Sequence, residues 1–280
     1  MSAAIFDRQA VRAHLLRAEK NWPKHDFIWK RTAAALQDRL LDVKRDFPHA
    51  LEMGVTPMVL TPEICAAKKI ASLTTCAPLY GWGVDRVCDE EALPFESQRF
   101  DLIVSNNHLH WVNDLPGALI QMKRALKPDG LLVFSMIGGE TLHELRHAIA
   151  QAESEVTGGI SPRVSPFAGL QDMAALMQRA QFALPVVDQE LVTITYKDLT
   201  SMLHELRGMG QGNAVAQRHK KILPKSFWPM VAHHYPSENE RLPASVEILY
   251  GHGWSPDASQ PQALQRGSGV VRLADILEKK

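Results

Sequence analysis

The stretch FDLIVSNNHLHWVNDLPGALIQMKRALKPDGLLVFS, residues 100–135, carries the clearest pattern of secondary structure in the chain. Two short apolar runs, at residues 102–104 and 131–134, bracket a segment from about 115 to 126 that has the character of a helix. The turn Lys-Pro-Asp-Gly at 127–130 ends that helix, because proline and glycine suit a turn and interrupt a helix. The stretch therefore predicts a strand, a helix and a second strand, in that order.

The same alternation continues on both sides of this stretch. Apolar runs at residues 50–53, 70–73 and 86–88 precede it, and runs at 186–196 and 246–250 follow it. Strands that are apolar throughout and alternate with helices are typical of a mostly parallel sheet covered by helices on both faces. We expect a doubly wound α/β sheet that is closed by the two late strands, one of them antiparallel.

The remaining segments surround this core. A helix opened by Asp26 has apolar residues at every third or fourth position, and it belongs to an N-terminal helical segment, 1–47, before a core at 48–196. Thr141 and Glu144 have the spacing of a capping box, which predicts a helix to about 155, and another helix is expected at 170–180. Residues 160–167 contain two prolines and should form an ordered loop or lid. Residues 197–243 are expected to be a helical insertion that caps the pocket, followed by a last strand and tail at 244–280.

The composition argues against several classes of protein. Thirty-one basic and thirty-one acidic side chains cancel, so no net charge draws the chain to nucleic acid or to an anionic membrane. No apolar run approaches the ~18 residues of a membrane-spanning helix. Asp7 and Glu19 do not suit a targeting presequence, and we expect a cytoplasmic protein.

Cysteines and histidines give no sign of a metal site. Cys65, Cys76 and Cys88 are odd in number and lack a C-x-x-C spacing, so neither structural zinc nor a disulfide is expected. The histidine pairs at 143 and 147 and at 233 and 234 have no third ligand in view. We therefore expect no bound metal.

Ligands of parallel sheets bind where the strands end, so the residues after each strand are candidates for a site. A nucleotide-type cofactor needs glycines after the first strand, but Gly54 stands there with Thr56 and Met58 at the positions of a second and third glycine. After the second strand, residues 73–76 offer no carboxylate for a ribose. Asp89 and Glu90 follow the third strand, where they either form a solvated turn or bind a purine amino group or an amide.

The fourth strand is followed by an unusual polar and aromatic loop. Ser105 and Asn106 end the strand, and His110 and Trp111 follow a few residues later. His110 is a candidate proton donor or acceptor, because the ordinary pKa of histidine is about 6.5. The alternative, in which His110 and Trp111 pack as a hydrophobic plug of the loop, stays open.

Several motifs resemble those of known enzymes. Four of them resemble, in order and spacing, motifs of the class I S-adenosylmethionine (AdoMet) methyltransferases: EMG at 52–54, DEEALPF at 89–95, FDLIVS at 100–105 and LKPDG at 126–130. Others resemble a branch that contains the malonyl-carrier-protein methyltransferases of biotin synthesis and, closer still, the mitochondrial complex I assembly factors that hydroxylate an arginine. These are IFDR at 5–8, DVKRDFP at 42–48, HWVNDLP at 110–116, GGETLHELR at 138–146 and RGSG at 266–269. The resemblance implies a Rossmann-like fold with a mostly parallel, seven-stranded sheet.

The resemblance also implies where AdoMet would bind. The cofactor-binding residues it assigns are Glu52, Gly54, Asp89, Glu90, Ser105 and Asn106. Two of the three loop glycines and the ribose carboxylate of the family are missing here. We therefore expect AdoMet binding to be weak or absent.

Three functions are open at this point. The closer resemblance implies a protein of the complex I assembly type that acts on or binds a protein partner, namely a complex I subunit or an assembly intermediate. Residues 160–167 and 197–243 would form its partner-facing or substrate-facing rim, with anchors at Trp111, Arg163, Phe167 and Trp228, and further anchors at Arg207, Phe227 and Tyr235. The alternatives are an active methyltransferase on a small or carrier-bound carboxylic acid, and a pseudoenzyme that serves as a scaffold.

Overall fold

The computed structural model describes residues 4–55, 58–219 and 222–261. Thr56 and the motif RGSG at 266–269 lie outside the described residues. Seven strands form one sheet in the order β3-β2-β1-β4-β5-β7-β6. Their bounds are β1 His49–Met53, β2 Ser72–Ala77, β3 Arg86–Val87, β4 Phe100–Asn106, β5 Leu126–Ile137, β6 Ala183–Tyr196 and β7 Leu242–Trp254.

The direction of the strands confirms the predicted doubly wound sheet. β1 to β5 pair in parallel, whereas β7 lies antiparallel between β5 and β6. Each predicted strand is present, although β2 begins two residues later than its apolar run and β5 takes in the Lys-Pro-Asp-Gly turn. The chain order reverses between β1 and β4, and the carboxyl ends of these two strands are where ligands of such sheets bind.

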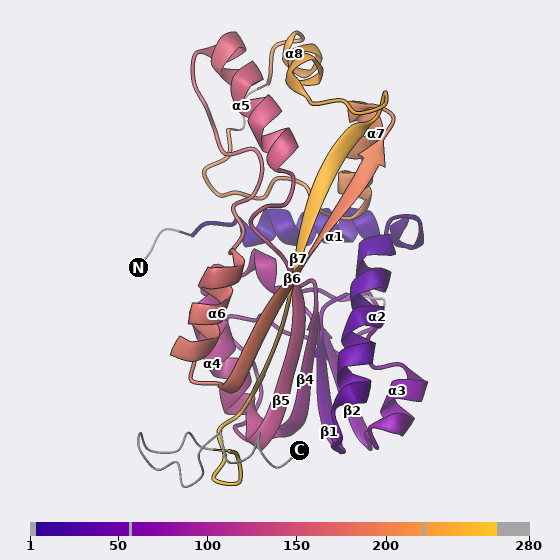
Figure 1. The fold of residues 1–280 in the computed structure, drawn as a ribbon, viewed down its shortest axis with the longest axis vertical. Coiled ribbons are helices and arrows are strands. Elements are labelled where there is room, and N and C mark those ends of the chain that lie inside the picture. The colour runs from indigo at the N-terminus through magenta and orange to yellow at the C-terminus, as the bar shows by residue number, and fades with distance from the viewer. Residues whose placement is uncertain (1–3, 56–57, 220–221, 262–280) are drawn as a thin grey trace, which may run out of the picture.

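Helices cover both faces of the sheet, as Figure 1 shows. On one face lie α2 (Phe27–Asp42) and α3 (Pro62–Ala67), and on the other lie α4 (Leu115–Ala125) and α6 (Leu170–Arg179). Alternate residues of β4 supply the two apolar cores, because successive side chains of a strand point to opposite faces. Leu102 and Val104 pack in the cluster of α2, while Ile103 packs in the cluster of α4 and α6.

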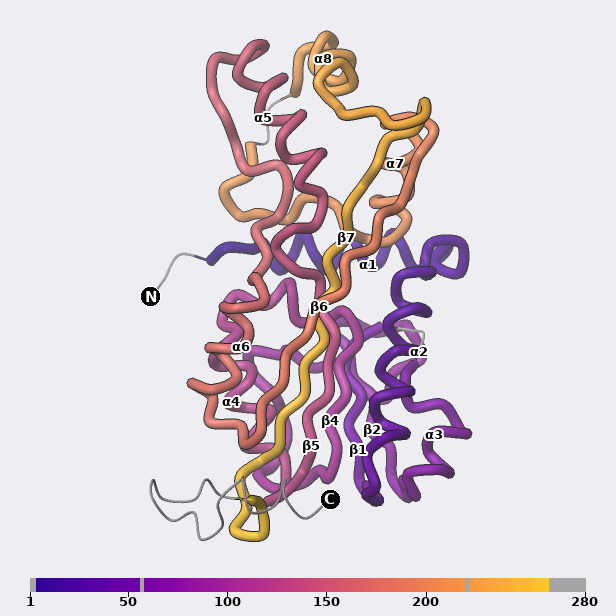
Figure 2. The backbone as a smooth tube through the Cα atoms, viewed as in Figure 1, coloured from indigo at the N-terminus to yellow at the C-terminus, as the bar shows by residue number. Residues whose placement is uncertain are grey.

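A cap stands over the carboxyl end of the sheet. It contains α5 (His143–Thr157), α7 (Leu199–Gly208), α8 (Phe227–His234) and the ends of β6 and β7 that extend beyond β5, where residues 191–196 pair only with 242–247. Figure 2 shows these two strands running together from the sheet into the cap. The cap has its own apolar core, which includes Leu145, Phe227 and Val231. Between cap and sheet run α1 (Arg8–Glu19) and the short helix η1 (Trp22–Lys24).

The predicted capping box before α5 is wrong. The N-cap position belongs to Leu142, which has φ +55° and no side-chain cap. Thr141 and Glu144 bind β7 instead: Thr141 Oγ1 donates to the carbonyl of Glu247, and Glu144 accepts from the backbone N–H of Ser245. The two side chains therefore anchor α5 to β7 rather than close its first turn.

The expectation of no disulfide is also wrong. Cys76 ends β2 and Cys88 follows β3, and the two form a disulfide with their Cα atoms 5.9 Å apart. Cysteines 12 positions apart meet because β2 and β3 are adjacent parallel strands. Cys65 is a free thiol. None of the helices in the described ranges is long and apolar enough to cross a membrane.

Candidate functional site

The first part of the site is the loop that follows β1. Glu52 is buried, and its carboxylate accepts hydrogen bonds from the backbone N–H groups of Val59 and Leu60. Burial raises the pKa of Glu52 to about 7, although the two hydrogen bonds favour its charged form. Gly54 has φ +127°, and a Cβ there would lie 3.3 Å from the carbonyl oxygen of Asn106. Glu52 and Gly54 therefore determine the conformation of the loop after β1 through contacts within the protein.

An ion-pair network occupies the ends of β3 and β4. The guanidinium of Arg8 pairs with Glu90 and lies 3.5 Å from Asp89, while His108 pairs with Glu90 from the other side. Arg12 lies 3.2 Å from Asp89. Burial would raise the pKa of Glu90, but the charges of His108 and Arg8 outweigh it and hold the pKa at about 2. Glu90 is thus a charged group enclosed by its own counterions.

Ser105 and Asn106 are the last two residues of β4, and both are buried. Asn106 Oδ1 accepts from Thr32 Oγ1 at 2.6 Å and from Ser135 Oγ at 2.9 Å, and its Nδ2 donates to the carbonyl of Trp29 at 3.1 Å. Ser105 Oγ is buried without a hydrogen-bond partner among the described residues. Asn106 therefore fixes α2 on β4 and β5.

His110 and Trp111 lie on the short helix η2 (Leu109–Trp111) that follows β4. The His110 ring is buried, with its centroid 5.3 Å from those of Trp111 and Phe167, and its Nε2 lies 3.2 Å from Oε1 of Gln211. Burial lowers the pKa of His110 to about 3, so the ring is neutral at pH 7. A neutral imidazole packed between aromatic rings agrees with the interpretation of His110 as a hydrophobic plug. Its nitrogens can still donate or accept hydrogen bonds.

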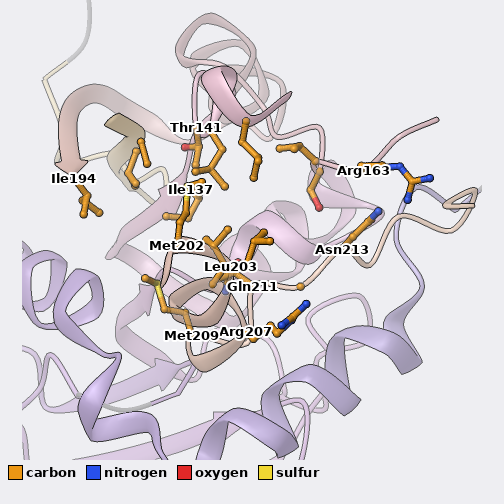
Figure 3. Close-up of a pocket in the computed structure, with 18 of the residues that line it drawn as sticks. Ile137, Thr141, Arg163, Ile194, Met202, Leu203, Arg207, Met209, Gln211 and Asn213 are labelled. Atoms are coloured by element: carbon orange, nitrogen blue, oxygen red, sulfur yellow. The ribbon is translucent and has the colours of Figure 1, made fainter. Parts of the chain in front are cut away.

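A cavity of about 280 Å³, which we call the chamber, lies between the sheet and the cap (Figure 3). Its wall is mainly apolar and takes in Ile137 of β5, Ile194 of β6 and Met202 of α7. Figure 3 shows Arg163 and Asn213 on one side and Ile194 on the other. None of the described residues that line the chamber is an Asp or a Glu.

The structure brings four predicted rim residues together at the chamber. Trp111, Arg163, Phe167 and Trp228 all line it, although they come from widely separated parts of the chain. Trp228 keeps 38% of its surface exposed, but Trp111 keeps only 4%. Arg163 is paired with Glu153 at 2.6 Å and stacks over Phe227.

The expected exposed anchors Phe227 and Tyr235 are buried, so that prediction is wrong. Both belong to the core of the cap, where apolar side chains from α5, α7 and α8 cover them. Trp111 is likewise a wall of the chamber and not an exposed rim residue. Aromatic residues of a small cap pack inward because the cap must bury a core of its own.

Comparisons with known proteins agree with this architecture. A model of the methyltransferase domain family matches residues 65–134. The mitochondrial arginine-hydroxylase NDUFAF5 of Mus musculus is 35% identical over 296 residues, which cover 97% of this chain and 83% of that protein. The malonyl-[acyl-carrier protein] O-methyltransferase of Gallionella capsiferriformans is 34% identical over 295 residues, 98% of this chain and 99% of the relative. The chain belongs to the class I AdoMet-dependent methyltransferase superfamily.

The fold of this superfamily member also agrees with a solved structure. The YcgJ protein of Bacillus subtilis superposes with a TM-score of 0.51 at 12% identity, covering 82% of this chain and 100% of that one. A likeness at this identity concerns the fold. One fold of this kind hosts many functions, and the chemistry of the site decides among them.

The superfamily implies AdoMet, and the site can be tested for its fit. AdoMet needs room beside the backbone after β1 and a carboxylate for its ribose hydroxyls. Here Glu52 holds the loop at 59–60 and Glu90 lies between the guanidinium of Arg8 and the ring of His108. β2 ends in Cys76 and Ala77, without a carboxylate. In this arrangement the carboxylates of Glu52, Asp89 and Glu90 are engaged with the protein itself, so the charged groups expected to hold AdoMet do not fit the cofactor.

Sequence reasoning missed several residues of the chamber. They are Leu142 before α5, Met202 and Leu206 of α7, Met209, and the polar pair Gln211 and Asn213. Apolar residues at 199, 202, 203 and 206 of α7 have helical spacing, which was a usable signal of a buried face. Gln211 and Asn213 follow the helix in an irregular segment, and no sequence pattern marks them.

Proposed function

We propose that this chain is a protein of the complex I assembly type that acts on or binds a protein partner and binds AdoMet weakly or not at all. The observation that carries the proposal is the network of Arg8, Glu90 and His108 at the carboxyl ends of β3 and β4. In this network the Glu90 carboxylate is held by Arg8 and His108 and is not free to bind a cofactor. The similarity to NDUFAF5 along 97% of the chain supports the assembly type, and a complex I subunit or assembly intermediate is the proposed partner.

Calorimetric titration of the whole chain with AdoMet tests the cofactor half of the proposal. We expect a Kd well above about 1 μM, since each unpaired polar group costs about 1–3 kcal/mol and every 1.4 kcal/mol is tenfold in affinity. The double variant Thr56→Gly, Met58→Gly should bind AdoMet more tightly than the wild type. A submicromolar Kd for the wild type would overturn the proposal.

Affinity capture tests the partner half. Trp228 is an exposed aromatic at the mouth of the chamber, and Tyr80, which is 80% exposed, serves as a matched control that does not line the chamber. We expect the wild type and Tyr80→Ala to recover a complex I subunit or assembly intermediate, and Trp228→Ala to lose it. Equal recovery by both variants would show that the chamber mouth is not the recognition surface.

A second candidate function is methyl transfer to a carboxylic acid, and the chamber favours it. Trp111 lines the chamber, and its buried Nε1 has no hydrogen-bond partner among the described residues. Arg207 adds positive charge, whereas the charge of Arg163 is balanced by Glu153, and no acidic side chain from the described part of the chain lines the wall. Such a lining suits an oxygen acceptor on the substrate better than a guanidinium.

The two functions separate in one assay. The purified chain is incubated with AdoMet and a malonyl-loaded carrier protein, and the acid is examined by mass spectrometry for the gain of one methyl group. Our leading proposal predicts no gain. A methyl ester that disappears in the Trp111→Phe variant would establish the second function instead.

A further inference from the structure

A second cavity adjoins the chamber, and neither of the functions proposed above uses it. It has a volume of about 480 Å³ and lies between α1, η1 and α7. We call it the vestibule. Its lining combines two arginines, three histidines and two amides with small residues: Arg17, Arg207, His14, His25, His204, Asn21, Asn213, Ala18, Gly208 and Gly212.

The charge of the vestibule is positive and largely uncompensated. Among the residues that the structure describes, neither Arg17 nor Arg207 forms an ion pair with a carboxylate, and Arg17 Nε donates to the carbonyl of Ala13. One nearby acid pairs with a histidine of the vestibule wall, and another pairs with an arginine that does not line the vestibule. Glu205 lies 2.9 Å from Nδ1 of His25, and Asp7 lies 2.9 Å from Arg218. Two guanidinium groups without an ion pair of their own therefore line the cavity, and Glu205, an acid close to them, is bound to His25.

The imidazoles of the vestibule are held against backbone. A Cβ at Gly212 would lie 2.9 Å from Cε1 of His14, and a Cβ at Gly208 would collide with the ring of His25. Glycine at both positions lets the rings lie close to α7 and to the segment after it. Burial, followed by the charges of Arg17 and Arg218, lowers the pKa of His14, as expected in a positive field. Two of the three imidazoles of the vestibule are thus held in place by close contact with backbone.

Vestibule and chamber share part of their wall. Arg207, Gly212 and Asn213 line both cavities. The two cavities are therefore direct neighbours. Two arginines with amide donors match the oxygen-rich, doubly charged phosphate group better than a single carboxylate.

We propose that the vestibule is a binding site for a phosphate-class anion. The site depends neither on AdoMet nor on a protein partner, so this inference goes beyond the proposed function. Arg17 and Arg207 would supply the charge, and Asn21 would donate a hydrogen bond to a remaining oxygen. Asn213 Nδ2 already donates to the carbonyl of Pro162, so only its second N–H would be left for the anion.

Calorimetry of the whole chain with pyrophosphate tests the site. We expect saturable binding at low ionic strength that weakens about tenfold or more in Arg17→Gln and in Arg207→Gln. Arg179 at the end of α6 lines neither cavity and is the matched control, because Arg179→Gln removes the same charge elsewhere. The affinity of Arg179→Gln for pyrophosphate should stay within about twofold of that of the wild type.

Two further measurements distinguish a phosphate site from loss of folding and from general attraction of anions. Thermal melting of all three variants controls for folding, and each Tm should match that of the wild type. Citrate, which carries carboxylates instead of phosphates, should bind at least about tenfold more weakly than pyrophosphate. Absence of pyrophosphate binding, equal weakening in all three variants, or equal affinity for citrate would each overturn the proposal.

Discussion

At the scale of single residues, Glu52 connects the loop after β1 to the pH dependence of folding. Its pKa is about 7 in the folded protein against 4.5 for an ordinary glutamate, so folding holds the proton more tightly than the unfolded chain does. This group therefore costs stability as the pH rises from 4.5 to 7, by about 3 kcal/mol at most. Glu52→Gln should remove that cost.

Urea unfolding of wild type and Glu52→Gln at pH 5 and pH 8 measures the effect. Relative to the wild type, the variant should have a larger free energy of unfolding at pH 8 than it has at pH 5. If the two proteins show the same pH dependence, Glu52 is ionised in the fold and its burial is not what sets its pKa.

His110 shifts in the opposite sense. Its pKa is about 3 in the fold against 6.5 in the unfolded chain, so the stability that its neutral ring contributes is lost as the pH falls from 6.5 towards 3. His110→Ala should lower the free energy of unfolding by about 2–4 kcal/mol because it leaves a cavity between Trp111 and Phe167.

His110→Phe separates the two interpretations of this residue, since it keeps a ring and removes the nitrogens. Full partner recovery and a near-normal Tm in His110→Phe would identify a plug. Normal Tm with loss of recovery or activity would identify a polar role for the imidazole.

At the scale of elements, the disulfide between Cys76 and Cys88 closes the short connection from β2 to β3. Closing a loop of this size stabilises a fold by about 3 kcal/mol, mainly by restricting the unfolded chain. A reductant should therefore lower the Tm of the wild type and leave that of the double variant Cys76→Ser, Cys88→Ser unchanged.

Thiol labelling followed by mass spectrometry tests the bond directly. It should modify Cys65 alone before reduction, and labelling of all three cysteines would refute the bond.

At the scale of the whole molecule, β6 and β7 run without interruption from the sheet into the cap. Cap and sheet should therefore unfold in a single transition. Phe227→Ala, in the core of the cap, should shift the entire urea curve by about 3–5 kcal/mol, with tryptophan fluorescence and circular dichroism still coincident. Two separate transitions would mean that the cap folds as an independent unit.

The sequence predicted the sheet because strand and helix signals are local. The apolar runs at 102–104 and 131–134 lie in β4 and β5, and the antiparallel late strand is β7. The site was harder to predict because its contacts are not local. Arg8 reaches Glu90 across 82 positions and Glu144 reaches Ser245 across 101, and no periodicity records such pairs. The capping-box spacing at 141–144 misled for the same reason, since β7 competes for both side chains.

The place of β7 in the sheet also bears on synthesis of the chain. β7 is the last of the described strands in sequence, yet it lies between β5 and β6. While a ribosome is still making residues 242–254, β5 has a bare edge and β6, 14 residues long, has no strand to join. Until β7 emerges, the backbone N–H and C=O groups on one edge of β5 and one edge of β6 have no partner strand. Chaperones that bind exposed strand edges would act on the nascent chain in this period.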